Sequence, residues 1–163
     1  MINNKLTRTG IGYDVHRLSK DAKLIIGGIS IKFSKGSLGH SDGDALIHSI
    51  VDALLGAACL GDIGDFFSSD NSKWKGVSSE LFLKFSIQKL RSLGFEINNI
   101  DTNIIIQNPK LSKYKPNIIS NLARILEIEK KQISVKAKTA DKLGFIGRGD
   151  GWSCQAIATI YKK

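Results

Sequence analysis

The chain has 163 residues, of which 42% are hydrophobic and 24% charged, values typical of one soluble domain with a single packed core. No apolar run approaches the roughly 18 residues that a membrane helix needs, and the start lacks the apolar stretch of a signal peptide. The formal net charge of +9 favours anionic partners, but the lysines are spread along the whole chain, so we expect neither a nucleic-acid nor a membrane partner.

The two cysteines, Cys59 and Cys154, are too few for a disulfide framework, and both lie in apolar segments. We therefore predict buried free thiols and a reducing environment. The expected location is the cytoplasm, or a plastid-type organelle if a targeting segment has been removed.

The predicted elements mix strands and helices along the chain. Gly27-Gly28 between two short apolar runs is typical of a tight hairpin, and apolar residues recur at helical spacing from Asp44 to Leu60, where Gly61 is expected to end the helix. Polar loops are expected at 35–43 and 67–76. In chain order, we predict strands at 9–18, 24–26, 29–33, 95–107, 133–138 and 152–161, helices at 44–60, 78–94 and 112–126, and short turns at 62–66 and 142–147.

This mixture predicts an α+β fold, in which one mixed β-sheet carries helices on one face. We expect a single catalytic domain over residues 1–163, with about residues 1–8 disordered.

Three residues from two segments are candidate metal ligands. Asp14 and His16 are two residues apart in a predicted strand, so their side chains point to the same face. His48, in the first turns of the next helix, can supply a second nitrogen. A carboxylate and two imidazoles leave one position of a tetrahedral site open, as in catalytic zinc centres. The alternative is that His48 makes only a local salt bridge on the helix surface.

Other polar residues surround these candidates. Asp44, His48 and Asp52 share one helix face, so either aspartate could accept the ring N–H of His48 that does not face the metal. His40 and Ser41 lie in the glycine-flanked segment 39–43, where His40 could position or protonate a substrate; a solvated loop histidine is the alternative.

Three further segments carry groups suited to a phosphorylated ligand. Asp62-Ile63-Gly64 could hold a diol, although an N-cap aspartate explains it equally well. Gln107-Asn108-Pro109-Lys110 ends a strand and could meet a ligand, or it is a plain turn. The glycine-rich segment 136–149 suits an anion cradle with a second cation, such as Mg²⁺, at Asp141, and it lacks the Walker pattern.

Five segments together resemble a known enzyme family. They are, in order, GYDVHRL, IIGGISI, GHSDGDALIHSIVDALLGAACLGDIGDFF, NIIIQNPKL and KAKTADKLGFIGRGDG. The chain closely resembles the 2-C-methyl-D-erythritol 2,4-cyclodiphosphate synthase family of the non-mevalonate isoprenoid pathway, from about Thr9 to Ile160.

The resemblance implies a phosphorus–oxygen lyase that makes this cyclic diphosphate from 4-diphosphocytidyl-2-C-methyl-D-erythritol 2-phosphate and releases CMP. The 2-phosphate of the substrate would attack its own β-phosphate, with no protein nucleophile. The resemblance also implies a homotrimer with active sites between neighbouring subunits.

The resemblance further implies roles for single residues. Asp14, His16 and His48 would hold one Zn²⁺ per subunit, with Mn²⁺ or another divalent ion as an alternative, and Asp141 would hold Mg²⁺ with the substrate. His40 and Thr139 would be the catalytic residues. The implied substrate-binding residues are Asp14, Val15, His16, His40, Ser41, Asp62, Ile63, Gly64, Phe67, Ser68, Ser69, Asp70, Asn71, Ile106, Gln107, Asn108, Pro109, Lys110, Leu111, Ser112, Ala137, Lys138, Thr139, Ala140, Asp141, Phe145 and Arg148.

The chain departs from the family pattern at three places. Asp141 stands where the family usually has Glu, and Lys138 stands where it usually has Thr. Phe67-Ser68-Ser69 replaces an FPD-type loop, with Asp70 one residue further on. We expect these changes to affect substrate affinity more than the type of reaction.

Other functions fit parts of the sequence. A metal-dependent phosphoesterase would direct a metal-bound water at phosphorus and release a hydrolysed product. A basic nucleic-acid-binding module would bind RNA or DNA in a salt-dependent way, but it leaves the histidine arrangement unexplained. A metal-holding scaffold without activity is a third possibility, because the 67–69 loop departs from the family.

Overall fold

Five strands pair into one sheet within residues 6–163, the part of the chain that the computed structural model describes. The strand order is β4-β1-β7-β5-β6, with β1 (Thr7–Ser19), β4 (Gly36–Leu38), β5 (Phe95–Ile105), β6 (Ile133–Lys138) and β7 (Gly151–Lys162). Only β5 and β6 pair in parallel in this sheet, so it is mixed, as predicted. A separate hairpin joins β2 (Leu24–Ile26) and β3 (Ile29–Ile31).

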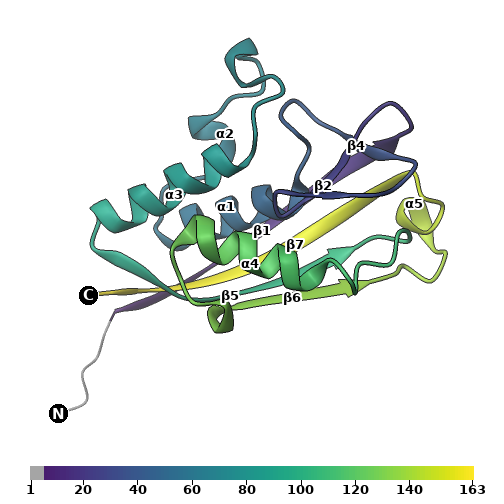
Figure 1. Cartoon of the computed structure of the whole chain (residues 1–163). Helices are drawn as coiled ribbons and strands as arrows, with labels where there is room; N and C mark the ends of the chain where they lie inside the picture. The colour runs from purple at the N-terminus through teal and green to yellow at the C-terminus, as the bar shows by residue number, and fades with distance from the viewer. Residues whose placement is uncertain (1–5) are drawn as a thin grey trace.

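The longer helices cover one face of this sheet (Figure 1). α1 (Ala45–Ala57) packs across β1 and β7, α3 (Glu80–Ser92) packs beside α1, and α4 (Lys115–Leu126) packs near β6. The short elements are α2 (Ile63–Phe66), α5 (Gly144–Gly147) and two 3-10 turns, η1 (Ser72–Trp74) and η2 (Lys130–Gln132). The predicted α+β fold with a mixed sheet is therefore confirmed. Within residues 6–163, none of these helices combines the length and apolarity that crossing a bilayer requires.

Two glycines of β1 let α1 approach the sheet closely. A Cβ atom on Gly12 would lie 1.9 Å from the Ser49 carbonyl oxygen, and one on Gly10 would lie 2.1 Å from the Ala53 carbonyl oxygen. The backbone of α1 therefore rests directly on β1 at these positions. This contact brings the first turns of α1, which carry His48, beside the inward-facing side chains of β1.

The hairpin between β2 and β3 is tied to the start of α1. Gly27 and Gly28 both have positive φ, 60° and 74°, as a two-residue type I′ turn requires. Their N–H groups donate to Oδ1 and Oδ2 of Asp44 at 3.0 and 2.6 Å, and Ile47 N–H donates to Oδ1 at 3.1 Å. Asp44 thus caps α1 and fixes the hairpin against it.

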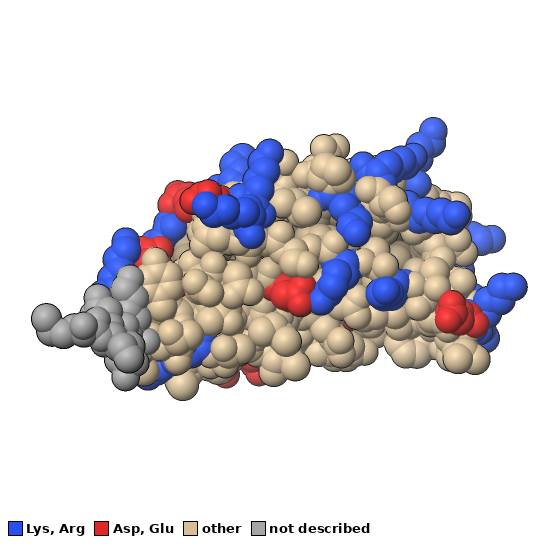
Figure 2. All heavy atoms as spheres, turned by 90° about the horizontal axis from the view of Figure 1, so that it is seen from below, with Lys and Arg blue, Asp and Glu red and all other residues tan. Residues whose placement is uncertain are grey.

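Within residues 6–163, none of the longer helices covers the other face of the sheet, and several large apolar side chains are exposed on it. Residues alternate along β1, so Ile11, Tyr13 and Val15 point away from α1 and are 71%, 53% and 44% exposed. Ile157 of β7, which pairs with Ile11, is 45% exposed. Figure 2 views the molecule from below: much of the surface is uncharged, and many Lys and Arg side chains lie toward its upper edge and its ends.

The N-terminal segment and the predicted loop 35–43 differ from the sequence-based prediction. Residues 1–5 of the predicted disordered start lie outside the described residues, but Thr7 and Arg8 already pair with β7, so disorder up to residue 8 was wrong. The predicted loop 35–43 contains β4, because residues 36–38 pair with the end of β1. Gly36 fits there because any Cβ atom would collide with the Lys23 backbone.

Several predicted element ends also shift. α1 ends at Ala57 rather than at Leu60, because Cys59 has φ 58° and the Leu60 N–H donates back to the Leu55 carbonyl. α4 begins at Lys115 rather than residue 112, with Pro116 in its first turn. α3 begins at Glu80, and β5 ends at Ile105, two residues before the prediction. Cys154 is buried, as predicted, but Cys59 is exposed.

Candidate metal and substrate site

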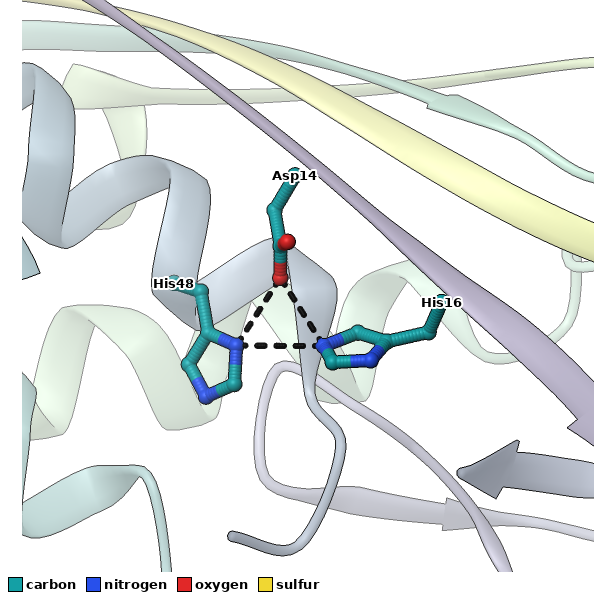
Figure 3. Close-up of side chains that lie close together, drawn as sticks. All are labelled: Asp14, His16 and His48. Carbon is teal, nitrogen blue, oxygen red and sulfur yellow. Dashed lines mark hydrogen bonds and ion pairs between the residues drawn. The ribbon is translucent and has the colours of Figure 1, made fainter. Parts of the chain in front are cut away.

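Asp14, His16 and His48 converge on one point (Figure 3). Oδ2 of Asp14 lies 2.9 Å from Nε2 of His16 and 2.8 Å from Nδ1 of His48, and the two nitrogens are 3.3 Å apart. Neighbouring ligand atoms of a tetrahedral zinc ion with bonds near 2.0–2.1 Å are separated by roughly 3.3 Å. The donor set of one carboxylate and two imidazoles therefore fits a divalent metal ion with a fourth position left open.

The orientation of His16 supports this fit. Its Nδ1 lies 2.9 Å from the carbonyl oxygen of Leu38 in β4, and a carbonyl can only accept a hydrogen bond. Nδ1 therefore carries the hydrogen, and a neutral His16 presents the bare lone pair of Nε2 to Asp14. A lone pair facing a carboxylate is favourable only if a cation, either a proton or a metal ion, lies between them.

The electrostatics of the triad favour such a cation. Burial acts to raise the pKa of Asp14, but hydrogen bonds and charge from His16 and His48 outweigh it and hold this pKa well below its usual range. Burial acts to lower the pKa of His16, but Asp14 and the Leu38 carbonyl raise it above its usual value. Asp14 therefore stays ionised, and the centre stabilises positive charge.

Neither predicted carboxylate orients His48. Asp44 uses its oxygens for the α1 cap and the hairpin, and Oδ1 of Asp52 accepts the Ile63 N–H at 2.9 Å. The Nε2 atom of His48 instead lies 2.8 Å from the Ser79 hydroxyl and 3.0 Å from the Ser41 hydroxyl. The prediction that Asp44 or Asp52 accepts from this ring was wrong, because both aspartates bind backbone N–H groups.

The segment of His40 and Ser41 lies beside the triad. Ser41 contacts His48 directly, as described above, and Nε2 of His40 lies 3.1 Å from the Asn71 carbonyl oxygen. The Gly76 N–H also donates to the His40 carbonyl. The loop 67–76 is therefore attached to the predicted catalytic histidine.

The side chain of Asp62 forms the cap of α2. Its Oδ1 accepts N–H groups from Gly64 and Asp65, and the Asp65 carboxylate accepts the Asp62 N–H in return. This is the N-cap alternative that the sequence left open; Ile63 and Gly64 form the first turn.

In the 67–76 loop, the ring of Phe67 packs against Trp74, Phe82 and Phe85. The Ser68 and Asn71 side chains accept the N–H groups of Asp70 and Lys73, and residues 68–71 are all exposed.

A second group of predicted residues forms a separate pocket of about 300 Å³. It lies where the end of β6 meets the segment after β5, and it contains none of the three triad residues. Its lining residues are Ile106, Gln107, Pro109, Lys110, Leu111, Ser112, Ala137, Lys138 and Thr139. Nine predicted substrate-binding residues from two distant segments are thus brought together.

The remaining predicted residues lie around α5. The Thr139 hydroxyl donates to Oδ1 of Asp141 at 3.0 Å, and Ala140 accepts the Leu143 N–H. Phe145 and Arg148 line a cavity of about 630 Å³ together with Val15 and His16. Asn108 lines a neighbouring pocket with Arg148. These contacts connect α5 to the His16 side of the triad.

Two contributors to the site were not found from the sequence: the Leu38 carbonyl and Ser79. Ser79 lies at the start of α3, 31 residues from His48 in the chain. Leu38 contributes through its backbone, which no side-chain pattern indicates.

Comparisons with known proteins place the chain in an enzyme family. The sequence model of the YgbB family matches residues 7–161, and the chain belongs to this family. The chain is 49% identical to the 2-C-methyl-D-erythritol 2,4-cyclodiphosphate synthase of Clostridium acetobutylicum, over 94% of this chain and 99% of that protein. The resemblance inferred from the motifs is therefore confirmed, and the chain is a lyase-type enzyme, as its relatives are.

Other relatives are longer proteins. The bifunctional enzyme IspD/IspF of Pelagibacter ubique is 46% identical over 98% of this chain, which spans 43% of that protein. The solved bifunctional IspDF of Campylobacter jejuni superposes with a TM-score of 0.95 and 40% identity, covering 98% of this chain and 43% of that one. The CDP complex of IspF from Plasmodium falciparum superposes with a TM-score of 0.85 and 38% identity, covering 96% and 97% of the two chains.

Proposed function

We propose that this enzyme converts 4-diphosphocytidyl-2-C-methyl-D-erythritol 2-phosphate to 2-C-methyl-D-erythritol 2,4-cyclodiphosphate and CMP, in non-mevalonate isoprenoid biosynthesis. The observation that carries the proposal is the convergence of Asp14, His16 and His48 in a chain 49% identical to a synthase of this name. One oxygen of the 2-phosphate forms a bond to the β-phosphorus. The bond between that phosphorus and the oxygen bridging to the α-phosphate breaks, and CMP leaves with this oxygen.

The residues of the chain position the reacting groups and neutralise charge. Asp14, His16 and His48 would hold Zn²⁺, or Mn²⁺ or another divalent ion, which when bound supplies Lewis-acid polarisation of the β-phosphate. Asp141 would hold Mg²⁺ with the substrate phosphates. His40 and Thr139 would donate hydrogen bonds to the charge that develops on the phosphoryl oxygens.

The pocket lined by residues of 106–112 and 137–139 is the proposed cytidine site. Its support is twofold: distant segments meet there, and the similar P. falciparum protein was solved as a CDP complex. Lys110 and Lys138 in its lining supply positive charge for the leaving nucleotide. The methylerythritol part would lie by Asp62, Ile63 and Gly64, near the triad.

The active enzyme would be a homotrimer with its sites between subunits. The exposed Ile11, Tyr13, Val15 and Ile157 on the uncovered sheet face support an interface between copies of the chain, because monomers rarely expose such apolar patches. A second support is that the cytidine pocket contains no triad residue, so a neighbouring chain could supply the metal centre to it.

The test is incubation of the metallated protein with the cytidyl substrate and Mg²⁺, followed by phosphorus NMR. We expect cyclic diphosphate and CMP without net uptake of water. A hydrolysed phosphate would instead identify a phosphoesterase, and fully metallated protein that forms no cyclic product would overturn the proposal.

A variant tests the metal centre itself. His48→Ala removes one of two nitrogen ligands, so it should lose stoichiometric zinc by elemental analysis while keeping the wild-type circular dichroism spectrum. Gln88→Ala, on the exposed side of α3, is the matched control and should retain zinc. Unchanged zinc content in His48→Ala would refute the ligand assignment.

A further inference from the structure

A buried serine contacts Nε2 of His48, the ring nitrogen that does not face Asp14. Ser79 has no exposed surface, and its hydroxyl lies 2.8 Å from Nε2 of His48. Ser79 stands at the N-cap position of α3, where a serine side chain usually accepts a helix N–H, yet it makes no such bond. Its hydroxyl instead contacts His48, a second partner, and, at 3.5 Å, the Ser41 hydroxyl.

The second partner is Asp42. The Ser79 hydroxyl donates to Oδ1 of Asp42 in a short hydrogen bond, and the Ser79 N–H donates to Oδ2 at 2.9 Å. An ionised carboxylate only accepts, so the single hydroxyl hydrogen of Ser79 points at Asp42. Toward His48, Ser79 can then act only as an acceptor.

This direction of hydrogen bonding determines the tautomer of His48. An acceptor 2.8 Å away requires a hydrogen on Nε2, and a neutral ring with that hydrogen has a bare Nδ1. Nδ1 is the atom that faces Asp14 and His16. Ser41 cannot impose the same choice, because its hydroxyl, 3.0 Å from Nε2, can either donate or accept.

We propose that Asp42 and Ser79 form a positioning pair that fixes His48 as the Nε2–H tautomer and so makes Nδ1 a metal ligand. The inference rests on the metal centre of the proposed function. Neither residue belongs to the triad or to the proposed substrate-binding residues. Partners of this kind usually affect metal affinity by about 10–100-fold when they are removed.

The experiment measures zinc affinity by competition with a chelator, and the absorption spectrum of the Co²⁺-loaded protein. Ser79→Ala should bind Zn²⁺ about 10–100-fold more weakly and change the Co²⁺ bands. Asp42→Asn should also weaken binding, because it frees the Ser79 hydrogen to point at His48. Ser79→Thr keeps the hydroxyl and should restore most of the affinity.

Ser78→Ala is the matched control, since the hydroxyl of this neighbouring exposed serine accepts the Glu80 N–H, and the variant should bind as the wild type does. Folded Ser79→Ala and Asp42→Asn proteins that bind zinc within twofold of wild type would overturn the inference. If Ser79→Ala does not fold, nitrogen-15 NMR of histidine-labelled wild type without metal decides. A neutral His48 protonated at Nδ1 overturns the inference, and one protonated at Nε2 supports it.

The outcome is separable from that of the proposed function. If His48→Ala loses zinc but the Ser79 and Asp42 variants do not, only the positioning pair fails. If His48→Ala retains zinc, the metal centre itself fails.

Discussion

The Asp44 carboxylate accepts hydrogen bonds from three backbone N–H groups of two elements, and the residue is fully buried. Burial raises its pKa to about 6 from the usual 3.8, although the N–H groups of Gly28, Ile47 and Gly27 act to lower it. Between these two values the folded protein binds more protons at this group than the unfolded chain does. The free energy of unfolding should therefore fall as pH rises through this window.

Asp44→Asn should remove this contribution. Relative to Asp44→Asn, wild type should be more stable at pH 4 than at pH 6. We expect the difference between their unfolding free energies to change by up to about 3 kcal/mol between these two pH values. Urea denaturation at several pH values, with a chelator present, measures this difference. A difference that is constant across the window, or that grows with pH, would show that the Asp44 carboxyl does not titrate in this way.

Lys138 is an exposed cation on the lining of the proposed cytidine pocket, and among the described residues it has no ion-pair partner. Lys138→Thr should weaken the binding of CDP by about threefold to tenfold and reduce its dependence on salt. Calorimetric titration at two salt concentrations measures both. Lys136→Thr removes the same charge but from a residue paired with Asp101, outside the pocket, and should leave CDP binding nearly unchanged.

A substitution in β1 tests the close contact between β1 and α1. Gly12→Ala would place its Cβ atom 1.9 Å from the Ser49 carbonyl oxygen, so the helix must move away from the strand. We expect a loss of about 3 kcal/mol or more of unfolding free energy, together with weaker metal binding, because His48 shifts relative to Asp14.

Gly56→Ala is the matched control for that variant. Gly56 is exposed in α1, and an added Cβ atom would contact nothing within 4 Å. Alanine should therefore stabilise the protein by about 0.5–1 kcal/mol through its higher helix propensity. Thermal and urea denaturation of both variants provide the comparison, and equal effects would contradict the close-packing account.

The elements that the sequence predicts well are those with a strong internal period. The alternation of β1 and the helical spacing of α1 were recognised, and so was the Gly27-Gly28 turn. β4 was missed because three residues, Gly-Ser-Leu, have no pattern of their own and are a strand only through pairing with β1. The end of α1 was misplaced because Cys59, two residues before Gly61, already adopts the left-handed conformation.

The same distinction applies to the site. The spacing of Asp14 and His16 predicted their shared face. His48 was added because it lies in the first turns of the next helix and can supply a second nitrogen ligand. The structure brings all three together. The partners of the histidine rings were predicted incorrectly or missed. The Leu38 carbonyl and Ser79 are set by tertiary contacts across 22 and 31 residues, which local sequence patterns do not encode.

At the scale of the whole molecule, the uncovered sheet face predicts self-association. Ile11→Glu places a charge beside Ile157 at the centre of the apolar rows, so the proposed trimer should dissociate to folded monomers. Light scattering coupled to size-exclusion chromatography measures the mass. Leu81→Glu changes a 45% exposed leucine on α3 and should stay trimeric. A wild-type monomer, or an Ile11→Glu trimer, would contradict the proposed interface.

Strand β1 contributes both to the triad and to the exposed apolar face, because its residues alternate between the two faces of the sheet. Asp14 and His16 face α1, whereas Tyr13 and Val15 face the open side, and eleven residue pairs between β1 and β7 fix this arrangement. A slip of one residue in that pairing would move the carboxylate and imidazole to the outer face and put aromatic and branched side chains where Gly12 now contacts α1. A misregistered chain would therefore lose the triad, the docking of α1 and the apolar outer face together, so all three depend on the register of a single strand.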